Sequence, residues 1–195
     1  EERIVREFEA VFASIEKTDG LIIDLRANPG GNEGYGRPIL ACLFDRPFQT
    51  TIRGTRRNRA YFRAQGQAVD WHVWPQQILQ PHGTKFYSKP VVVLTSARTG
   101  SAAEDFLSSL VIEKRVIIVG EATGGSTGQP LFVTLPGGGG AGICTSKSWY
   151  PDGSTFVGVG IQPHIRVSPT IAGVRAGQDE ILEAALEHLR KRAAE

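Results

Sequence analysis

Ser101 lies in the stretch of this chain with the clearest potential for chemistry. It belongs to TSARTGSAAEDF, residues 95–106, which follows the apolar run PVVVL and precedes a segment with helical spacing. Ser101 and Glu104 have the spacing of a capping box, in which the serine oxygen accepts from a backbone N–H and the glutamate reaches back. A helix start also gathers free N–H groups at the positive end of the helix dipole. The serine oxygen could there attack a carbonyl while a neighbouring N–H holds the oxyanion. Ser101 is therefore either a helix cap or a nucleophile.

Two glycine-rich loops follow apolar runs elsewhere in the chain. The first, in DLRANPGG, places Gly30 and Gly31 directly after LIIDL, and the second is EATGGSTGQ after RVIIVG. A Pro-Gly-Gly turn leaves backbone N–H groups unobstructed, which suits an anion cradle, although the same residues also make ordinary turns. Neither loop contains GxGxxG or GxxxxGK[ST], so a phosphate site is not indicated. Asp24 and Arg26 flank the first loop and are expected to pair and hold its shape.

The histidines are candidates for a general base, which must come within hydrogen-bond reach of Ser101. The chain has four of them: His72, His82, His164 and His188. His188 is expected on the solvated side of the last helix, and His164, after a proline at a strand end, is expected to be structural. His72 and His82 lie in an irregular connection that could fold over the site, so they remain catalytic candidates.

Arginines form the one marked basic patch of the sequence. They are interleaved with Tyr61 and Phe62, which makes a nucleic-acid surface one interpretation. The formal net charge of the chain is only +2, however, so a solvated face is favoured and no nucleic-acid partner is expected. A third interpretation is an edge that binds a peptide by strand addition. The arginines are Arg46, Arg53, Arg56, Arg57, Arg59 and Arg63.

The composition is that of an ordinary globular domain. A chain of 195 residues, 41% hydrophobic and 22% charged, can bury one substantial core. No apolar run approaches the roughly 20 residues that cross a bilayer, so no membrane span is expected. Cys42 and Cys144 lack the spacing of a zinc site, and they either pair or serve as small apolar residues.

Hydrophobic periodicity and turn residues predict the elements that position these loops. We expect helices, buried strands and a hairpin around the GGGG turn, with exposed strands over 48–64 and an irregular connection over 65–89. The expected helices are 2–17, 36–43, 102–113 and 179–192, and the expected buried strands are 21–25, 90–96 and 115–120.

The order of strand, helix and strand over 90–120 predicts a parallel pair joined by a crossover helix. In a parallel sheet the loops after the strands emerge together at the carboxyl ends, where α/β proteins place their sites. The NPGG loop, Ser101 and the second glycine loop all follow strands. Their convergence favours a site over a simple cap.

The chain resembles the tail-specific (C-terminal processing) peptidases, a group that includes tricorn-type proteases. The resemblance implies an α/β fold with a crotonase-like (ββα) core, a mainly parallel sheet flanked by helices, and no metal or organic cofactor. It also implies that Ser101 is the nucleophile, with an oxyanion hole formed by the N–H of Ala102 and of Gly30 or Gly31. The motifs that carry it are LIIDLRANPGG, PVVVLTSARTGSAAEDFLSSL, VIIVGEATGGSTGQ, SWYPDGS and GVGIQPHIRV.

One departure from the family pattern concerns the base. Many members carry a lysine in a GExTxGKG pattern, where this chain reads GEATGGSTG and has Ser126. A hydroxyl cannot by itself act as a base at neutral pH, so the serine-lysine dyad is absent. This places the chain nearer the lysine-less tricorn-like members, whose base is a histidine from a preceding segment. Val157, where such relatives may carry an acidic group, departs from their pattern too. Ser126 would then orient the base or the substrate.

The resemblance gives a functional hypothesis with a rival. We expect residues 1–195 to be a single peptidase core domain, a piece of a longer chain with helical and PDZ-like segments upstream. The expected activity is serine endopeptidase cleavage of extended or unfolded proteins, in a periplasmic or otherwise exported location, or alternatively in the cytoplasm. The rival is a catalytically silent ligand- or peptide-binding module on the same scaffold. An acyl-CoA enzyme of the crotonase fold is disfavoured, because SAAE offers a nucleophile that such enzymes do not need.

Overall fold

A four-stranded parallel sheet forms the centre of the computed structural model, which describes residues 2–68 and 70–193. The strand order is β1-β6-β7-β11, and each neighbouring pair is parallel. The predicted parallel sheet flanked by helices is therefore confirmed. Its strands are β1 (Leu21–Asp24), β6 (Val91–Thr95), β7 (Ile117–Gly120) and β11 (Ile165–Arg166).

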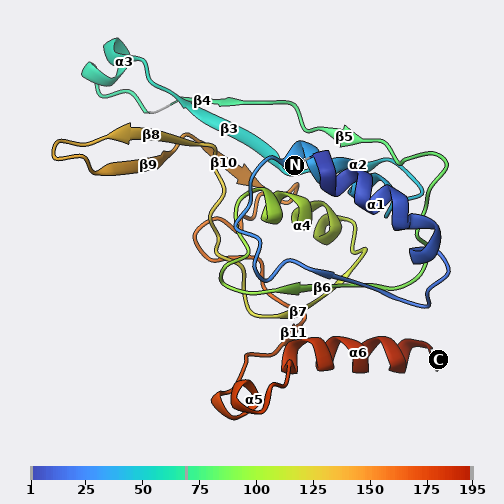
Figure 1. Cartoon of the computed structure of the whole chain (residues 1–195). Helices are drawn as coiled ribbons and strands as arrows, with labels where there is room; N and C mark the ends of the chain where they lie inside the picture. Colours follow the sequence, from blue (N-terminus) through green and yellow to red (C-terminus); the bar gives the residue numbers. More distant parts are fainter. Residues whose placement is uncertain (1, 69, 194–195) are drawn as a thin grey trace.

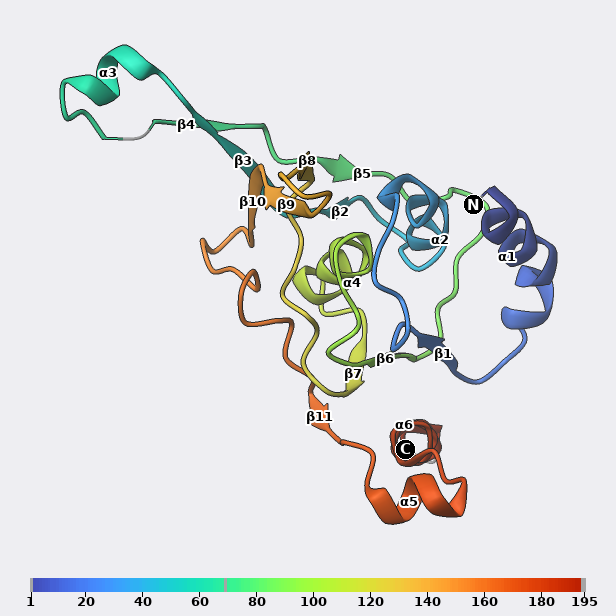
Figure 2. The same cartoon turned by 60° about the vertical axis from the view of Figure 1, so that its left-hand side comes forward.

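Helices cover both faces of this sheet (Figure 1). In Figures 1 and 2, α4 and α2 lie on one side of the sheet and α6 lies on the other. The four predicted helices are present, with ends shifted by a few residues, and α3 and α5 are additional. The helices are α1 (Glu2–Ile15), the 3-10 turn η1 (Glu33–Tyr35), α2 (Arg37–Ala41), α3 (Ala60–Ala64), α4 (Ala102–Ile112), α5 (Ile171–Ala176) and α6 (Glu180–Ala193).

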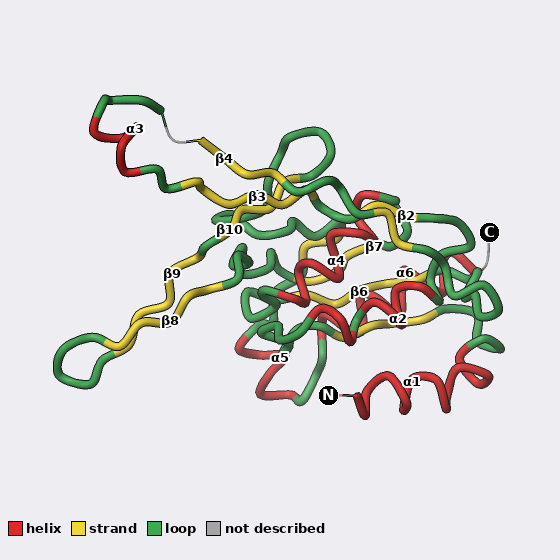
Figure 3. The backbone as a smooth tube through the Cα atoms, turned by 90° about the horizontal axis from the view of Figure 1, so that it is seen from above, coloured by secondary structure: helices red, strands yellow, loops and turns green. Residues whose placement is uncertain are grey.

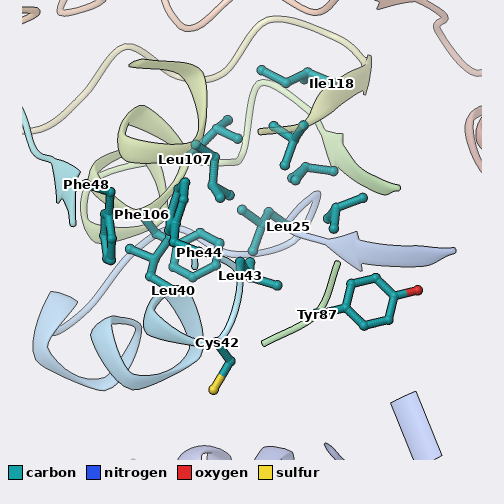
Figure 4. Packing of buried hydrophobic residues seen from close by; sticks show 14 of the residues in the cluster. Leu25, Leu40, Cys42, Leu43, Phe44, Phe48, Tyr87, Phe106, Leu107 and Ile118 are labelled. Atoms are coloured by element: carbon teal, nitrogen blue, oxygen red, sulfur yellow. The ribbon is translucent and has the colours of Figure 1, made fainter. Parts of the chain in front are cut away.

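The strand β6 is buried along its whole length because both of its faces are covered. Val91 and Val93 join the main core with Leu107 of α4, whereas Val92 and Leu94 join a second core against α6. Figure 4 shows the main core, where side chains of α2 and α4 meet. Full burial of one such aliphatic side chain contributes roughly 1.5–3 kcal/mol. This packing fixes the end of β6 and therefore the loop that carries Ser101.

A second layer of short antiparallel strands lies beside α4. It contains a three-stranded sheet in the order β10-β3-β4 and a pair formed by β2 and β5. The expectation of exposed strands over 48–64 is correct for its first part but wrong for α3, and 65–89 is not irregular throughout, because it contains β4 and β5. The strands are β2 (Phe48–Gln49), β3 (Ile52–Arg57), β4 (Asp70–Val73), β5 (Ile78–Leu79) and β10 (Ser146–Trp149).

Two hairpins project from the body in Figure 3. One is β3 and β4 with α3 at its tip, and the other is β8 (Pro130–Thr134) with β9 (Gly140–Cys144). The hairpin predicted around GGGG is confirmed, but its second strand ends at Cys144, and β10 pairs with β3 instead.

The cysteines do not pair: Cys42 is buried and Cys144 is exposed, both as free thiols. The interpretation as a small buried residue therefore holds for Cys42 alone. In the described part of the chain, every helix is too short or too polar to cross a membrane.

Candidate active site

Ser101 occupies an unusual backbone conformation at the start of α4. Its φ of 51° and ψ of −125° lie outside the helical region, in a part of conformational space that costs a non-glycine residue about 1–3 kcal/mol. The turn before it is held by Thr99, whose hydroxyl donates to the Leu25 carbonyl oxygen at 2.8 Å. Ser96 similarly donates to the carbonyl oxygen of Arg26 at 2.7 Å. These bonds tie the loop after β6 to the loop after β1, so the strained residue is held from both sides.

Both residues of the predicted capping box are in place at the start of α4, and the hydrogen bonds between them that have normal geometry use the Glu104 carboxylate and the backbone. Glu104 accepts from the N–H of Ser101 at 3.1 Å through Oε2. The N–H of Glu104 donates at 2.8 Å to the carbonyl oxygen of Ser101. Because that N–H is satisfied by the backbone, the Ser101 side chain is half-exposed and available to a ligand.

Gly30 lies directly against Ser101. A Cβ built on Gly30 would stand 2.5 Å from the Ser101 Cβ and 2.9 Å from the backbone nitrogen of Ala102, and its φ is +107°. Only glycine permits this approach. The N–H of Gly100 donates to the carbonyl oxygen of Asn28 at 3.0 Å, which fixes the two loops together. The expected convergence of the NPGG loop with the start of α4 is therefore present in the structure.

The two glycines of the first loop differ in their hydrogen bonding. The N–H of Gly30 donates to Oδ1 of Asn28 at 3.0 Å, so it is already engaged. Over residues 2–68 and 70–193, the N–H groups of Gly31 and Ala102 have no protein acceptor. Gly31 is exposed, and a Cβ built on it would meet no atom within 4 Å. Free N–H groups next to a serine oxygen can donate hydrogen bonds to an oxyanion that develops there.

Glu104 joins the nucleophile segment to the second glycine loop. Its side chain is completely buried (0% exposed), and its carboxylate accepts the Thr123 hydroxyl. It also accepts the N–H of Gly125 at 2.7 Å and the N–H of Ser126 at 2.9 Å. With the bond from Ser101, four donors surround one buried carboxylate, as a buried charge requires.

Ser126 contacts the site through its backbone. Its carbonyl oxygen accepts the N–H of Ser101 at 2.8 Å, and its own N–H donates to Glu104. Its side chain is exposed on the same loop. The position that the family pattern gives to lysine is therefore adjacent to Ser101, with a hydroxyl in place of an amine.

The histidines bind elsewhere. Within the described residues none forms a hydrogen bond with Ser101: His72 Nδ1 lies 2.9 Å from Arg57 and His82 Nδ1 lies 3.2 Å from Thr84. His164 Nδ1 accepts the N–H of Ile118 at 3.0 Å, which agrees with its predicted structural role. His188 is half-buried on α6 rather than solvated, which corrects that expectation.

The predicted pairing of Asp24 with Arg26 is confirmed. Arg26 Nη2 lies 2.7 Å from Asp24, and Nη1 lies 2.6 Å from Asp179, just before α6. Hydrogen bonds from Arg26 lower the pKa of both carboxyl groups and raise the pKa of the guanidinium. The pair therefore connects the loop after β1 to α6 as well as holding the loop's shape.

Arg53 is not part of a solvated face, which corrects the expectation for that member of the basic patch. Its guanidinium contacts Glu33, just after the first glycine loop, and Asp105, at 2.9 Å. Burial raises the pKa of Asp105, against the opposing charge of Arg53. Thr127 also donates to Asp105 at 3.1 Å. These charged groups lie at the edge of a cavity of about 690 Å³ beside α4.

Three features of the site were not predicted as functional. Glu104 was recognised only as a cap, although it lies on the same helix face as Leu107, and a carboxylate on an apolar face is a signal of a buried polar site. No sequence pattern marks Asn28. Its side-chain oxygen accepts the N–H of Gly30, so of the two glycines it is Gly31 whose N–H has no acceptor among the described residues. Asp105 belongs to a contact with β3 that the local sequence does not encode.

Comparison with known proteins agrees with these motifs. The chloroplastic C-terminal processing peptidase of Tetradesmus obliquus is 27% identical over 152 residues, covering 78% of this chain and 29% of that protein. The carboxy-terminal-processing protease of Bartonella bacilliformis is 25% identical over 169 residues, covering 86% of this chain and 35% of that protein. A solved structure of a peptidase from Parabacteroides merdae, described as putative in its own name, matches with a TM-score of 0.81 and 25% identity, covering 95% of this chain and 56% of that one.

The chain thus spans about a third of the length of these two curated relatives. The matches support the tail-specific peptidases and do not favour a silent binding module. A nearer relationship to the tricorn-like members stays a prediction. Residues 2–167 match peptidase family S41, and the chain belongs to that family.

Proposed function

We propose that this chain is the core of a serine endopeptidase that cleaves extended or unfolded proteins through an acyl-enzyme. The observation that carries the proposal is the strained Ser101 at the start of α4, pressed against Gly30. The N–H of the next residue, Ala102, and the N–H of Gly31, next to Gly30 in the first glycine loop, have no acceptor among the described residues. A serine oxygen beside free amides at a helix start is the arrangement that acyl transfer needs.

In the proposed reaction the Ser101 oxygen attacks the carbonyl carbon of a peptide bond. The N–H groups of Ala102 and Gly31 stabilise the oxyanion, because the Gly30 N–H is held by Asn28. The positive end of α4 adds to this stabilisation. Collapse of the tetrahedral intermediate releases the amine and leaves an ester on Ser101, which water then hydrolyses.

The proposal assigns the general base to a histidine beyond residues 1–195. Among the described residues no histidine forms a hydrogen bond with Ser101, and the contacts of His72, His82 and His164 are with other residues. The lysine position holds Ser126. The Ser126 hydroxyl, exposed beside Ser101, orients that base or the substrate. Ser126 is thus a positioning residue, and Ser101 is the catalytic nucleophile.

The proposed partners are unfolded or extended polypeptides, and the proposed location is the periplasm or another exported compartment, with the cytoplasm as the alternative. The proposed location is supported by the exported location expected for most members of the family and by the chloroplastic name of one relative. Cell fractionation of the source organism, with a marker for each compartment, tests it.

A fluorophosphonate probe tests the nucleophile in the full-length protein. We expect the wild type and Ser154→Ala, which alters an exposed turn serine, to be labelled equally, and Ser101→Ala to remain unlabelled. Wild type and Ser154→Ala should also digest a chemically unfolded protein at equal rates, and Ser101→Ala should not digest it. Labelling of full-length protein but not of residues 1–195 alone supports the external base. Equal labelling of Ser101→Ala contradicts the assignment, and a folded wild type that is neither labelled nor active supports the silent module instead.

A further inference from the structure

The cavity beside α4 has no role in the chemistry proposed for Ser101. Its volume is about 690 Å³, within the roughly 300–1,000 Å³ that ligand pockets occupy. It lies between α4, η1, α2 and the short strands β3, β5 and β10, which belong to the layer that projects above α4 in Figure 2. Its wall includes Glu33, which follows the first glycine loop, and Asp105, which follows Ser101 on α4.

The cavity begins close to the nucleophile. Asp105, which lines it, is one helical turn beyond Ser101, or about 6 Å along the axis of α4. Glu33, which also lines it, follows Gly31 by two residues. An extended peptide advances about 3.4 Å per residue. A peptide with its carbonyl at Ser101 would therefore place the side chain of one of its next two residues at the cavity.

Part of the cavity wall is apolar, although most of the lining residues are polar or charged. Leu40 of α2 and Phe106 of α4 are buried and line it, and Leu79 of β5 is half-buried beside them. Figure 4 shows Leu40 and Phe106 close together in the core. Trp74, 43% exposed, stands on the cavity wall just after β4. An aromatic or branched aliphatic side chain would exchange water for these surfaces.

The charged groups of the cavity neutralise one another. Arg53 contacts both Glu33 and Asp105, and Arg37 Nη2 lies 2.8 Å from Glu33. Each charge already has an opposite partner, so an acidic ligand would have to break a partly buried ion pair. Asp105 Oδ1, in contrast, is buried without a hydrogen-bond partner among the described residues and could accept from a donor. An apolar side chain leaves these pairs intact. The cavity therefore selects against Asp and Glu.

We propose that this cavity is a subsite for a large apolar side chain of the substrate, Phe or Leu in character, carried by a residue within two positions of the cleaved bond. The subsite rests on the proposed peptidase function. It gives that function a substrate class: unfolded segments with an exposed large apolar residue next to the cleaved bond.

Internally quenched decapeptides, varied one position at a time through Ala, Leu, Phe, Asp and Lys, test the subsite with full-length protein. At one position next to the cleaved bond we expect kcat/KM for Phe or Leu to exceed that for Ala by about tenfold, the value of one buried apolar side chain. Asp should fall below Ala. Trp74→Ala should reduce the Phe preference to about threefold or less, and Ser109→Leu, which adds volume on the α4 wall, should reduce Phe more than Ala.

The matched control is Phe132→Ala, which removes an aromatic side chain that is 77% exposed on β8 and does not line the cavity. It should keep the full Phe preference. A flat profile over all positions in an active enzyme, or a Phe preference that survives both Trp74→Ala and Ser109→Leu, overturns the subsite while the peptidase assignment stands.

A binding measurement tests the subsite without requiring cleavage, so it distinguishes the subsite from the catalytic reaction. Fluorescence anisotropy with labelled decapeptides and the Ser101→Ala protein should show tighter binding of the Phe peptide than of the Ala peptide, with the same dependence on Trp74. If the wild type cleaves nothing but this binding difference is found, the subsite stands and the peptidase proposal fails. If neither cleavage nor a binding difference is found, both proposals fail.

Discussion

The N–H of Ser101 donates a hydrogen bond of 2.8 Å to the carbonyl oxygen of Ser126. This bond makes the backbone of the nucleophile part of the second glycine loop, and the buried carboxylate of Glu104 binds both segments. Ser101 is thus held by a loop that follows a different strand of the sheet. The geometry of the site depends on both loops together.

Glu104→Gln should destabilise the protein by about 3 kcal/mol or more and abolish fluorophosphonate labelling. Each carboxylate oxygen of Glu104 accepts two donors, so a glutamine NH₂ would face two donors and leave them unsatisfied. Urea unfolding and labelling at equal protein concentration measure the two effects. Glu183→Gln, the same change at an exposed position of α6, should alter neither. A fully stable and labelled Glu104→Gln protein would show that the carboxylate charge is not required.

Gly30→Ala should destroy the site, because its new Cβ would stand 2.5 Å from the Ser101 Cβ and 2.8 Å from the Gly100 oxygen. Gly66→Ala is a matched control: its φ is also positive, at +73°, but no atom lies within 4 Å of the new Cβ. The control should lose about 1 kcal/mol from backbone strain alone. Gly30→Ala should lose more stability in the same urea titration and should not be labelled. Equal losses in the two variants would contradict the close approach.

Three of the four strands of the central sheet were predictable because they are short apolar runs bounded by glycine, proline and polar residues. The fourth, β11, has only two residues, one of them Arg166, and was not predicted. Val91–Thr95 is buried on both faces. A short apolar run of branched residues between turn signals is typical of such a strand. The region 48–89 was predicted less well. The pairing of β3 with β10 joins segments far apart in the chain, and α3 has only five residues at the tip of a hairpin. Local propensity carries little information about either.

The candidate site was predictable to the level of loops but not of single donors. Ser101 and the glycine pair are candidates because they follow strands, whereas Ala102 is a candidate through the family resemblance, and their catalytic roles stay predictions. The choice of Gly31 over Gly30 as the free amide depends on the side chain of Asn28, and hydrogen bonding of that kind cannot be read from residue spacing. The position of Asp105 against Arg53 likewise requires the tertiary fold.

Ser126→Ala should leave the free energy of unfolding within about 0.5 kcal/mol of wild type. Its contacts with Ser101 and Glu104 are made by its backbone, and its side chain is exposed. If its hydroxyl orients the base, the variant should lower kcat with little change in KM, and Ser126→Thr should restore part of the loss. Unchanged kcat in Ser126→Ala would remove the side chain from the mechanism and leave the loop contact as its only role.

Arg26→Gln should weaken the protein near neutral pH and have little effect in acid. Hydrogen bonds from Arg26 depress the pKa of Asp24 and Asp179, so these ionised carboxylates stabilise the fold above their ordinary pKa, and the contribution is lost as pH falls through the depressed values. Urea midpoints of wild type and variant should therefore converge as the pH falls below the ordinary pKa of an aspartate, about 3.9. Arg3→Gln, which removes an exposed helix pair with Glu7, should show no such convergence. A constant difference at all pH values would rule out the ion pairs as the cause.

Tyr150 should make the protein less stable in alkali. Burial, followed by the charges of Glu104 and Asp152, raises the pKa of Tyr150 from 10.0 to about 12. The folded state therefore keeps the phenol proton at pH values where the unfolded chain releases it, so unfolding becomes more favourable between about pH 10 and 12. Up to on the order of 2 kcal/mol is lost across this window.

Tyr150→Phe removes the titrating group, so its free energy of unfolding should fall less steeply than that of wild type over the same pH range. Tyr61→Phe, at a side chain that is 69% exposed, should follow the wild-type curve. Urea unfolding at several pH values measures the slopes. The ultraviolet absorbance of the tyrosinate reports the titration itself. Parallel curves for wild type and Tyr150→Phe would mean that Tyr150 titrates alike in the folded and unfolded chains, and its burial would then carry no alkaline stability cost.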